Sequence, residues 1–364
     1  MNSMRAKLMS LKKHRDKIDS LDERIIKLLN QRAKHSQAIG AYKKENNQLV
    51  YAPDREKKLL KRLKSLNAGP IKNSSIESIY REIMSSSLSL EKALRIAYLG
   101  PEMTFSHQAS VKHFGRSVSH IPCKTITDIF ADVENGRSDY GIVPVENSTE
   151  GAIYFTLDSF AQSDLKICAE IIMQIDLSLL SKDKELSKIK AVYSNPQVFG
   201  QCRQWLESHL PGVPFMSEAS TAKSALITTQ KKNSACISSA LIAEKHSLNI
   251  LASAIQDNSN NVTRFLVLAK EAALPTGDDK TSIVISIKDK AGALTRVLSA
   301  FEKRKVNLSK IESRPSKKGH WDYLFFIDFD AHSHEKKAVE ALAELERDCE
   351  VLKVMGSYPK SSLR

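Results

Sequence analysis

The pattern of apolar residues from Leu8 to Lys44 predicts one long helix. At 3.6 residues per turn, these residues recur along a single face of that helix. They are Leu11, Ile18, Leu21, Ile25, Leu28, Leu29, Ala33, Ile39 and Gly40. Arg15, Arg32 and Lys43 fall on the same face. Because charged groups are rarely buried without a partner, this face indicates a binding site for an anion.

The spacing of the three cations restricts how they can meet one ligand. At about 1.5 Å per residue, Arg15 lies roughly 25 Å from Arg32 and roughly 40 Å from Lys43 along a straight helix. One small molecule cannot touch all three on one helix, but an antiparallel second copy can bring its own Arg15 to the far end. We therefore expect a homodimer, or a higher homo-oligomer, with sites shared between chains. The alternative is a coiled coil that tolerates cations in its seam.

Two shorter helical patterns complete an all-α N-terminal domain, expected at residues 1–92. The second helix opens after Pro53, and the third follows the turn at residues 67–70. Polar residues again lie on the inner faces of these helices. They are Arg55, Glu56, Ser87 and Glu91.

The next segment alternates short apolar strands with helical stretches, which predicts an α/β domain at residues 94–271. The predicted strands are Arg95–Leu99, Tyr140–Val145, Leu177–Leu180, Ala191–Tyr193, Ala235–Ile237 and Phe265–Ala269. Residues 272–280 form a linker. The remainder, 279–364, has the order βαββαβ, with strands at 282–287, 307–313, 323–329 and 350–357 and helices at 292–304 and 335–347. This order predicts an α+β ferredoxin-like domain.

Composition places the chain among globular proteins without a membrane anchor. It has 364 residues, of which 41% are apolar and 27% charged. We expect no transmembrane helix and no secretion signal, because no apolar run approaches 18 residues and the start lacks an apolar core; a transit peptide at residues 1–15 is a minor alternative. The five cysteines are scattered, so neither disulfides nor a metal site is indicated, and a cytoplasmic location fits. No cofactor is expected.

The formal net charge of +13 is concentrated in the first domain. Residues 1–92 hold 21 Lys and Arg against 10 Asp and Glu, a net charge of +11. Nucleic-acid binding would need exposed cations interleaved with aromatic residues, whereas the cations singled out above lie on an apolar face. Attraction of a small dianion is the preferred explanation, and neither a nucleic acid nor a membrane is the expected partner.

Hydroxyl- and Gly-rich segments follow several of the predicted strands. They are Gly100–Ser106, Pro144–Gly151, Tyr193–Gln197 with Gln201 beyond it, and Thr263–Phe265. Each segment alone is typical of a turn or a helix cap. Four of them in one order, after the cationic helical domain, are more specific.

The whole chain resembles the bifunctional chorismate mutase–prephenate dehydratase family of phenylalanine biosynthesis. In the helical domain, the resemblance implies an intertwined dimer and a chorismate site made by Arg15 of the partner with Arg32, Lys43, Arg55, Glu56, Ser87 and Glu91. The Claisen rearrangement to prephenate needs a folded substrate and a stabilised ether oxygen, with no nucleophile. Arg15 and Arg32 can hold the two carboxylates while Lys43 faces the ether oxygen.

Two residues of the mutase domain differ from some relatives. Glu91 stands where some have Gln, so it can donate a hydrogen bond only when protonated. Ala52 stands where some have an Asp that contacts the substrate hydroxyl. The second difference affects substrate affinity more than the type of reaction.

For the middle domain, the resemblance implies a two-lobed fold that binds prephenate in a cleft. The residues carried over are Thr104, Ser106, Asn147, Ser148, Thr149, Ser194, Gln201, Thr263, Arg264 and Phe265. The reaction needs anion-binding donors and a proton for the departing water, and Thr263 matches the family threonine assigned to the proton. A hydroxyl is a weak acid, so Thr263 relays or orients a proton whose source is not identified. Met103 replaces a usual Gly and Asn195 a frequent His.

The last domain resembles the ACT family of amino-acid sensors. The resemblance implies that L-phenylalanine binds at Gly292, Ala293 and Leu294, where a helix begins, and under Glu312, Ser313 and Arg314. The alternatives are a plain packing module for this domain, a non-catalytic binding protein for the whole chain, and an enzyme whose second site has decayed. Retention of Arg15, Arg32, Lys43, Arg55 and Thr263 argues against the non-catalytic alternative.

Overall fold

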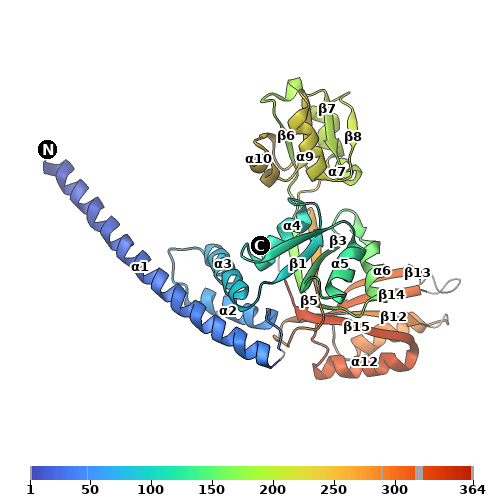
Figure 1. Ribbon diagram of the computed structural model, residues 1–364. Helices are drawn as coiled ribbons and strands as arrows, with labels where there is room; N and C mark the ends of the chain where they lie inside the picture. Colours follow the sequence, from blue (N-terminus) through green and yellow to red (C-terminus); the bar gives the residue numbers. More distant parts are fainter. Residues whose placement is uncertain (1, 47, 288–289, 316–322, 362–364) are drawn as a thin grey trace. The chain divides into compact units, whose positions relative to one another are not determined.

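A computed structural model describes residues 2–46, 48–287, 290–315 and 323–361, with side chains from Leu11 onward. The predicted C-terminal bound at residue 364 lies outside these residues. The chain divides into two compact units (Figure 1). The first holds the residues up to 51 together with 67–94 and 114–118, and the second holds the rest. None of the helices described is long and apolar enough to cross a membrane.

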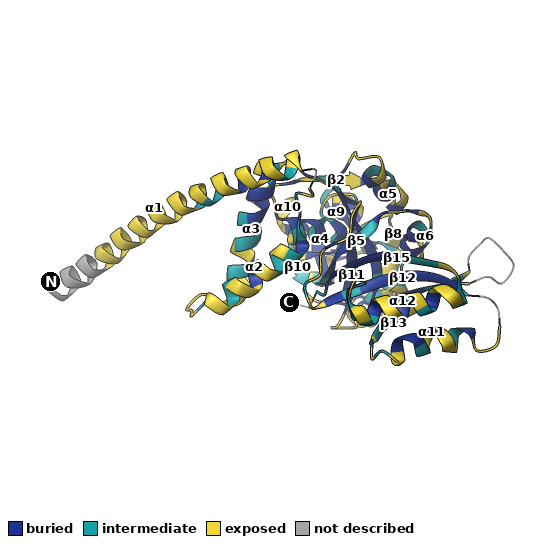
Figure 2. Ribbon diagram, turned by 90° about the horizontal axis from the view of Figure 1, so that it is seen from below, coloured by how far each residue is buried: buried dark blue, intermediate teal, exposed yellow. Residues whose placement is uncertain are grey.

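The first unit is built on two helices, α1 (Asn2–Glu45) and α3 (Asn73–Glu91). They approach closely at Gly40, where an added Cβ would lie 2.9 Å from the Cβ of Glu91. Most of α1 is exposed, including its apolar face (Figure 2). Leu11, Ile18 and Ile25 are 48%, 54% and 50% exposed, so within one chain this face has little cover.

The predicted second helix, α2 (Pro53–Leu66), forms as expected but belongs to the second unit. Its Lys57 ammonium lies 2.8 Å from a carboxylate oxygen of Asp278 and 2.7 Å from the Asp278 carbonyl oxygen. Leu60 is the buried apolar residue of this helix. All three helices of the predicted N-terminal region are therefore present.

The first lobe of the second unit is a mixed sheet with the spatial order β2-β1-β3-β11-β5, and β4 pairs with β3. Its strands are β1 (Arg95–Leu99), β2 (Ser119–Cys123), β3 (Tyr140–Asn147), β4 (Gly151–Ala152), β5 (Lys166–Gln174) and β11 (Val262–Ala269). Its helices are α4 (Phe105–Phe114), α5 (Ile126–Glu134) and α6 (Tyr154–Gln162). Strand β11 lies between β3 and β5, one strand in from the edge of the sheet, and runs antiparallel to both.

The second lobe has its own sheet, in the order β10-β6-β9-β7-β8. Its strands are β6 (Ser178–Ser181), β7 (Ala191–Ser194), β8 (Phe215–Ser217), β9 (Ser234–Ser238) and β10 (Asn249–Ala252). The helical elements are a 3-10 turn (Leu186–Lys188), α7 (Pro196–Gln201), α8 (Arg203–His209), α9 (Thr221–Gln230) and α10 (Ala240–His246).

Two chain segments connect the lobes, and they pair with each other. The amide of Ile175 donates to the Asn261 carbonyl oxygen at 2.8 Å, and the amide of Ile255 donates to the Leu177 carbonyl oxygen at 2.8 Å. Asn261 therefore lies at the return crossing, just before β11.

The C-terminal domain has the predicted βαββαβ order and the sheet order β13-β14-β12-β15. Its elements are β12 (Asp279–Ile287), α11 (Ala293–Glu302), β13 (Leu308–Pro315), β14 (Tyr323–Phe329), α12 (Lys336–Asp348) and β15 (Cys349–Pro359). Phe301, Phe329 and Leu345 are buried in its core. Gly356 of β15 lies so close to the Ile167 backbone of β5 that a Cβ could not fit, so the two sheets are in intimate contact.

Candidate functional site

The first group of site residues lies between α1 and α3. Arg32 donates to the Ser87 hydroxyl at 2.5 Å, and the Lys43 ammonium lies 3.5 Å from a carboxylate oxygen of Glu91. Lys43 also donates to the Val50 carbonyl oxygen at 2.6 Å. The Lys43 and Glu91 side chains are 17% and 8% exposed. Four of the predicted mutase residues, from distant parts of the sequence, are thus brought together.

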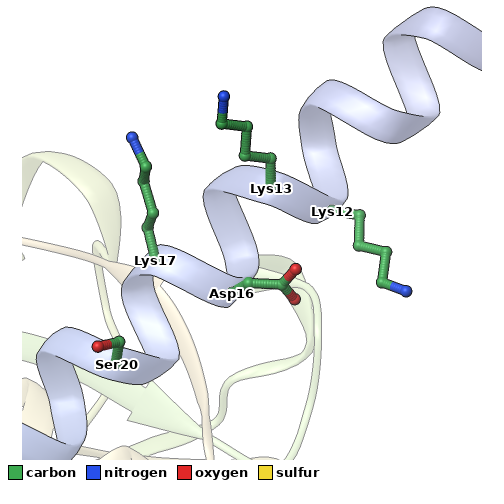
Figure 3. A pocket seen from close by; sticks show the side chains of 5 residues that line it. All are labelled: Lys12, Lys13, Asp16, Lys17 and Ser20. Carbon is green, nitrogen blue, oxygen red and sulfur yellow. The ribbon is translucent and has the colours of Figure 1, made fainter.

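The remaining mutase residues lie elsewhere on the helices. Arg15 is exposed on α1, and Arg55 and Glu56 lie in the first turn of α2 in the second unit. Their membership of the same pocket stays a prediction. Near Arg15, five residues of α1 alone line a shallow basic hollow, in which the Lys13 and Lys17 side chains project the same way (Figure 3). The five residues are Lys12, Lys13, Asp16, Lys17 and Ser20.

The second group of site residues gathers at Asn147, at the end of β3. Its side-chain amide donates to the Thr263 hydroxyl at 2.8 Å and to the Asn261 side-chain oxygen at 2.9 Å. Its own side-chain oxygen accepts from the backbone amides of Thr149 and Glu150 at 2.9 and 3.1 Å. Every polar atom of this side chain is therefore used to hold the turn and the Thr263 hydroxyl in place.

Asn261 extends this group toward the second lobe. Its amide donates to the Gln201 side-chain oxygen of α7 at 3.0 Å, and the residue is only 1% exposed. The prediction omitted Asn261. The available signal was its position two residues before Thr263, which places both side chains on one face of an extended chain.

Ser148 links the same turn to the segment that returns from the second lobe. Its hydroxyl donates to the Asn260 carbonyl oxygen at 2.9 Å and accepts from the Val262 amide at 2.9 Å. Together with Thr149, Gln201, Asn147 and Thr263, it belongs to one connected set of polar groups. Half of the predicted dehydratase residues are in this set.

The other predicted dehydratase residues lie outside the set and make different contacts. Thr104 donates its hydroxyl to the backbone of its own turn, at Leu99 and Pro101, and Ser106 lies in the first turn of α4. The Ser194 hydroxyl donates to the Ile237 carbonyl oxygen inside the second lobe. Phe265 is 1% exposed. Arg264 points its guanidinium toward the C-terminal sheet, where it contacts Asp328 and Tyr358, and it also donates to Glu170 of β5.

The two differences from the family pattern have local structural consequences. Met103 has a φ of 69°, the left-handed conformation in which a glycine is normally found. Asn195 caps α7, since its side-chain oxygen accepts from the Gln197 amide at 3.0 Å. The side chain at Met103 therefore comes with a strained backbone.

The residues predicted to bind L-phenylalanine lie on two elements of the C-terminal domain. Gly292, with φ 79°, precedes α11, which begins at Ala293, and Leu294 follows in its first turn. Glu312, Ser313 and Arg314 lie on β13. Arg314 forms a two-point ion pair with Asp158 of α6, at 2.5 and 2.8 Å, and its guanidinium lies 4.4 Å from the Tyr154 ring centre. These contacts raise the pKa of Arg314, chiefly through the hydrogen bonds with Asp158.

Three family models match successive parts of the chain. They are chorismate mutase type II at residues 14–92, prephenate dehydratase at 96–273 and the ACT domain at 281–347. The bifunctional chorismate mutase/prephenate dehydratase of Aquifex aeolicus is 46% identical over 97% of this chain and 99% of its own length.

Solved structures of prephenate dehydratases resemble about three quarters of the chain. A prephenate dehydratase from Arthrobacter aurescens in complex with L-Phe has a TM-score of 0.68 and 36% identity, over 73% of this chain and 90% of its own. The enzyme from Staphylococcus aureus has a TM-score of 0.65 and 28% identity, over 73% and 100%.

The domains and their polar sites define an enzyme with two activities and an attached ACT domain. The chain belongs to the family of bifunctional chorismate mutase/prephenate dehydratases, and it is both an isomerase and a lyase of phenylalanine biosynthesis.

Proposed function

We propose that the chain converts chorismate to prephenate between α1 and α3, and prephenate to phenylpyruvate at the polar set around Thr263, under feedback control by L-phenylalanine. The corresponding domains are residues 1–92, 94–271 and 279–364. The observation that carries the dehydratase part is the 2.8 Å hydrogen bond from Asn147 to Thr263.

In the mutase, each group has a role set by charge. Arg32 and Arg15 of the partner hold the two substrate carboxylates, because a guanidinium can bind a carboxylate in two-point fashion. Lys43 and a protonated Glu91 face the ether oxygen, where negative charge develops as the bond breaks. Arg55, Glu56 and Ser87 complete the pocket. Support comes from the Arg32–Ser87 and Lys43–Glu91 contacts.

In the dehydratase, the Thr263 hydroxyl orients or relays a proton toward the departing hydroxyl of prephenate, and a relayed proton is replaced on Thr263 as its own is passed on. The ring carboxylate leaves as carbon dioxide, the hydroxyl leaves as water, and the ring becomes aromatic. Because the Thr263 oxygen accepts a hydrogen bond from Asn147, its own hydrogen remains available for donation and becomes more acidic. Ser148, Thr149, Gln201, Thr104, Ser106 and Ser194 are proposed to line the prephenate site.

Replacement of Thr263 tests this assignment. Thr263→Ala should lower the dehydratase kcat on the order of 10²-fold or more, the usual scale for a positioned proton-transfer group. Thr263→Ser keeps the hydroxyl, so its dehydratase kcat should fall much less. Mutase activity on the same samples controls for folding. A loss below about threefold in the Ala variant would make Thr263 a structural residue.

We further propose that L-phenylalanine binds at Gly292, Ala293 and Leu294 and under Glu312, Ser313 and Arg314, between C-terminal domains of paired chains. The left-handed Gly292 supports this, because it opens the backbone before the free amides of α11. The Arg314–Asp158 ion pair offers a contact by which the effector segment can act on the dehydratase.

Gly292→Val should weaken inhibition while the uninhibited rate stays unchanged, since a branched side chain disfavours φ 79°. A coupling of about 1–3 kcal/mol corresponds to the 5- to 150-fold range typical of such control. Calorimetry should show weaker L-phenylalanine binding to this variant. Unchanged binding would place the effector elsewhere, most simply in the catalytic cleft.

A further inference from the structure

Strands β3 and β11 carry two sets of paired residues on opposite faces of the first sheet. In their register, Thr263 pairs with Asn147 and Arg264 pairs with Glu146. Since successive residues of a strand face opposite sides, Thr263 and Asn147 lie on one side and Arg264 and Glu146 on the other. The proposed catalytic threonine is thus one residue away from a cation that faces the C-terminal domain.

Arg264 is held by three groups at the junction with the C-terminal sheet. Its Nε donates to Glu170 at 2.9 Å, one Nη donates to Asp328 of β14 at 2.6 Å, and the other donates to the Tyr358 hydroxyl of β15 at 2.8 Å. Burial alone disfavours the guanidinium charge, but the negative groups around it outweigh burial and raise the pKa of Arg264 well above its usual value. Each of the three guanidinium nitrogens therefore donates to a protein group.

The partners of Arg264 are themselves buried and fixed. The Glu170 side chain is 0% exposed and also pairs with Lys280 of β12 at 3.1 Å. Asp328 accepts from the Ser282 hydroxyl at 2.5 Å. A buried ionic cluster whose members are all paired permits few alternative arrangements, so it fixes the place of the strand that carries Arg264.

A second ionic contact ties the neighbouring strand to the same domain. The Lys310 ammonium of β13 lies 2.8 Å from a carboxylate oxygen of Glu146. Glu146 immediately precedes Asn147, as Arg264 immediately follows Thr263. The C-terminal sheet therefore contacts both β3 and β11 on the face opposite to Asn147 and Thr263.

The strand pairing itself is irregular at this point. Arg264 pairs with Glu146, but the next residue, Phe265, pairs with Pro144, so the register shifts directly after the catalytic pair. A register shift weakens the ladder's control over where side chains point, and such irregularities re-aim side chains beside active sites. The pairing of β3 with β11 therefore does not by itself fix the Asn147–Thr263 geometry, although β11 pairs with β5 in regular register from Val262 to Val267.

We propose that Arg264 is a positioning residue of the dehydratase, and that the C-terminal sheet, through Asp328 and Tyr358 on Arg264 and through Lys310 on Glu146, sets the placement of Thr263 against Asn147. This rests on the proposed role of Thr263. It assigns Arg264 a role different from the prephenate contact expected from the sequence.

The two roles of Arg264 predict different kinetics. A prephenate ligand loses substrate affinity when changed, so KM rises. A positioning residue leaves the binding groups in place but misplaces Thr263, so kcat falls; a displacement of about 1 Å can cost about 10²-fold. In Arg264→Lys, which keeps one charge but cannot satisfy three partners, we expect kcat to fall about 10-fold with KM within about threefold.

Lys310 provides a second test, from the C-terminal domain. Its ion pair with Glu146 is less buried than the pair of Arg264 with Glu170. Lys310→Gln should lower the dehydratase kcat with little change in KM, and Lys310→Arg should keep the wild-type rate. Lys303→Gln is the matched control, because the Lys303–Glu344 pair, 3.0 Å apart, lies wholly within the C-terminal domain. Mutase activity and thermal melting on each variant exclude unfolding.

The outcome is decided by the two variants together. A fall in kcat at constant KM in Arg264→Lys and Lys310→Gln, absent in Lys303→Gln, is the expected result. If Arg264→Lys does not fold, Lys310→Gln decides by the same criterion. If these variants show a raised KM with kcat retained, or no change in either constant, the inference is wrong. The proposed role of Thr263 survives that result as long as Thr263→Ala is inactive. An active Thr263→Ala would instead overturn the proposed site, and the inference with it.

Discussion

Glu91 is a residue whose ionisation state decides what it can do. Its side chain is 8% exposed and lies 3.5 Å from the Lys43 ammonium. Only the neutral carboxyl can donate a hydrogen bond to the ether oxygen. The role proposed for Glu91 therefore requires its protonated form in the reacting complex.

This requirement predicts a pH dependence of the mutase with a definite sign. The rate should fall as pH rises, because the donor form of Glu91 is lost, and Glu91→Gln should flatten the profile, since an amide donates at any pH. The measurement is mutase kcat against pH for both proteins, with the dehydratase rate of the same samples as the control. A Gln variant with an unchanged profile would remove Glu91 from this role.

Met103 shows how one residue can depart from a family pattern without loss of the fold. A left-handed backbone costs a non-glycine residue about 1–2 kcal/mol. The side chain, however, packs against the buried cluster of the second lobe that contains Leu180, Ile242 and Leu248. A glycine could not make this contact, so the strain is offset by contact between the lobes.

Among the elements, α1 is the one that a single chain leaves incomplete. Its apolar residues Leu21, Ile25 and Leu28 are 51%, 50% and 61% exposed, and Arg15 lies on the same face far from Arg32. An exposed apolar face of this length marks an interaction surface. A second copy of α1 is the occupant we propose, because it also supplies the missing Arg15.

The shared site gives a complementation test. A heterodimer of an Arg15→Ala chain with an Arg32→Ala chain keeps one complete site and should regain about half of the mutase activity, whereas each homodimer is inactive. Pairing an Arg15→Ala/Arg32→Ala chain with the wild type is the control, and should give an inactive heterodimer. If each site belonged to one chain, the two heterodimers would give the opposite results.

Elements were predictable from sequence where local signals agree with the fold. The bounds of β1 and β14 match the predicted strands at residues 95–99 and 323–329. Strand β5 was not predicted, because Glu170 interrupts its apolar run, and that charge is explained only by Arg264 and Lys280 from distant segments. The contacts of Arg264 were likewise not predictable, since no local sequence pattern reveals which domain its guanidinium faces.

At the scale of the whole molecule, the two activities use different parts of the chain. Arg32, Lys43, Ser87 and Glu91 lie in the first unit, and the polar set around Thr263 lies in the second. The Arg32–Ser87 and Lys43–Glu91 contacts join residues of the first unit only, and the Asn147–Thr263 contact joins residues of the second. We therefore infer that each activity can be removed without the other.

Assaying both reactions on one Lys43→Ala protein tests this separation most directly. Loss of the ammonium that faces the ether oxygen should lower mutase kcat by about 10²-fold or more, the scale for removing one group that stabilises transition-state charge. Dehydratase activity on supplied prephenate should stay within about twofold of the wild type, and Thr263→Ala should show the reverse. An equal loss of both activities in a folded Lys43→Ala protein would contradict the account of two separate sites.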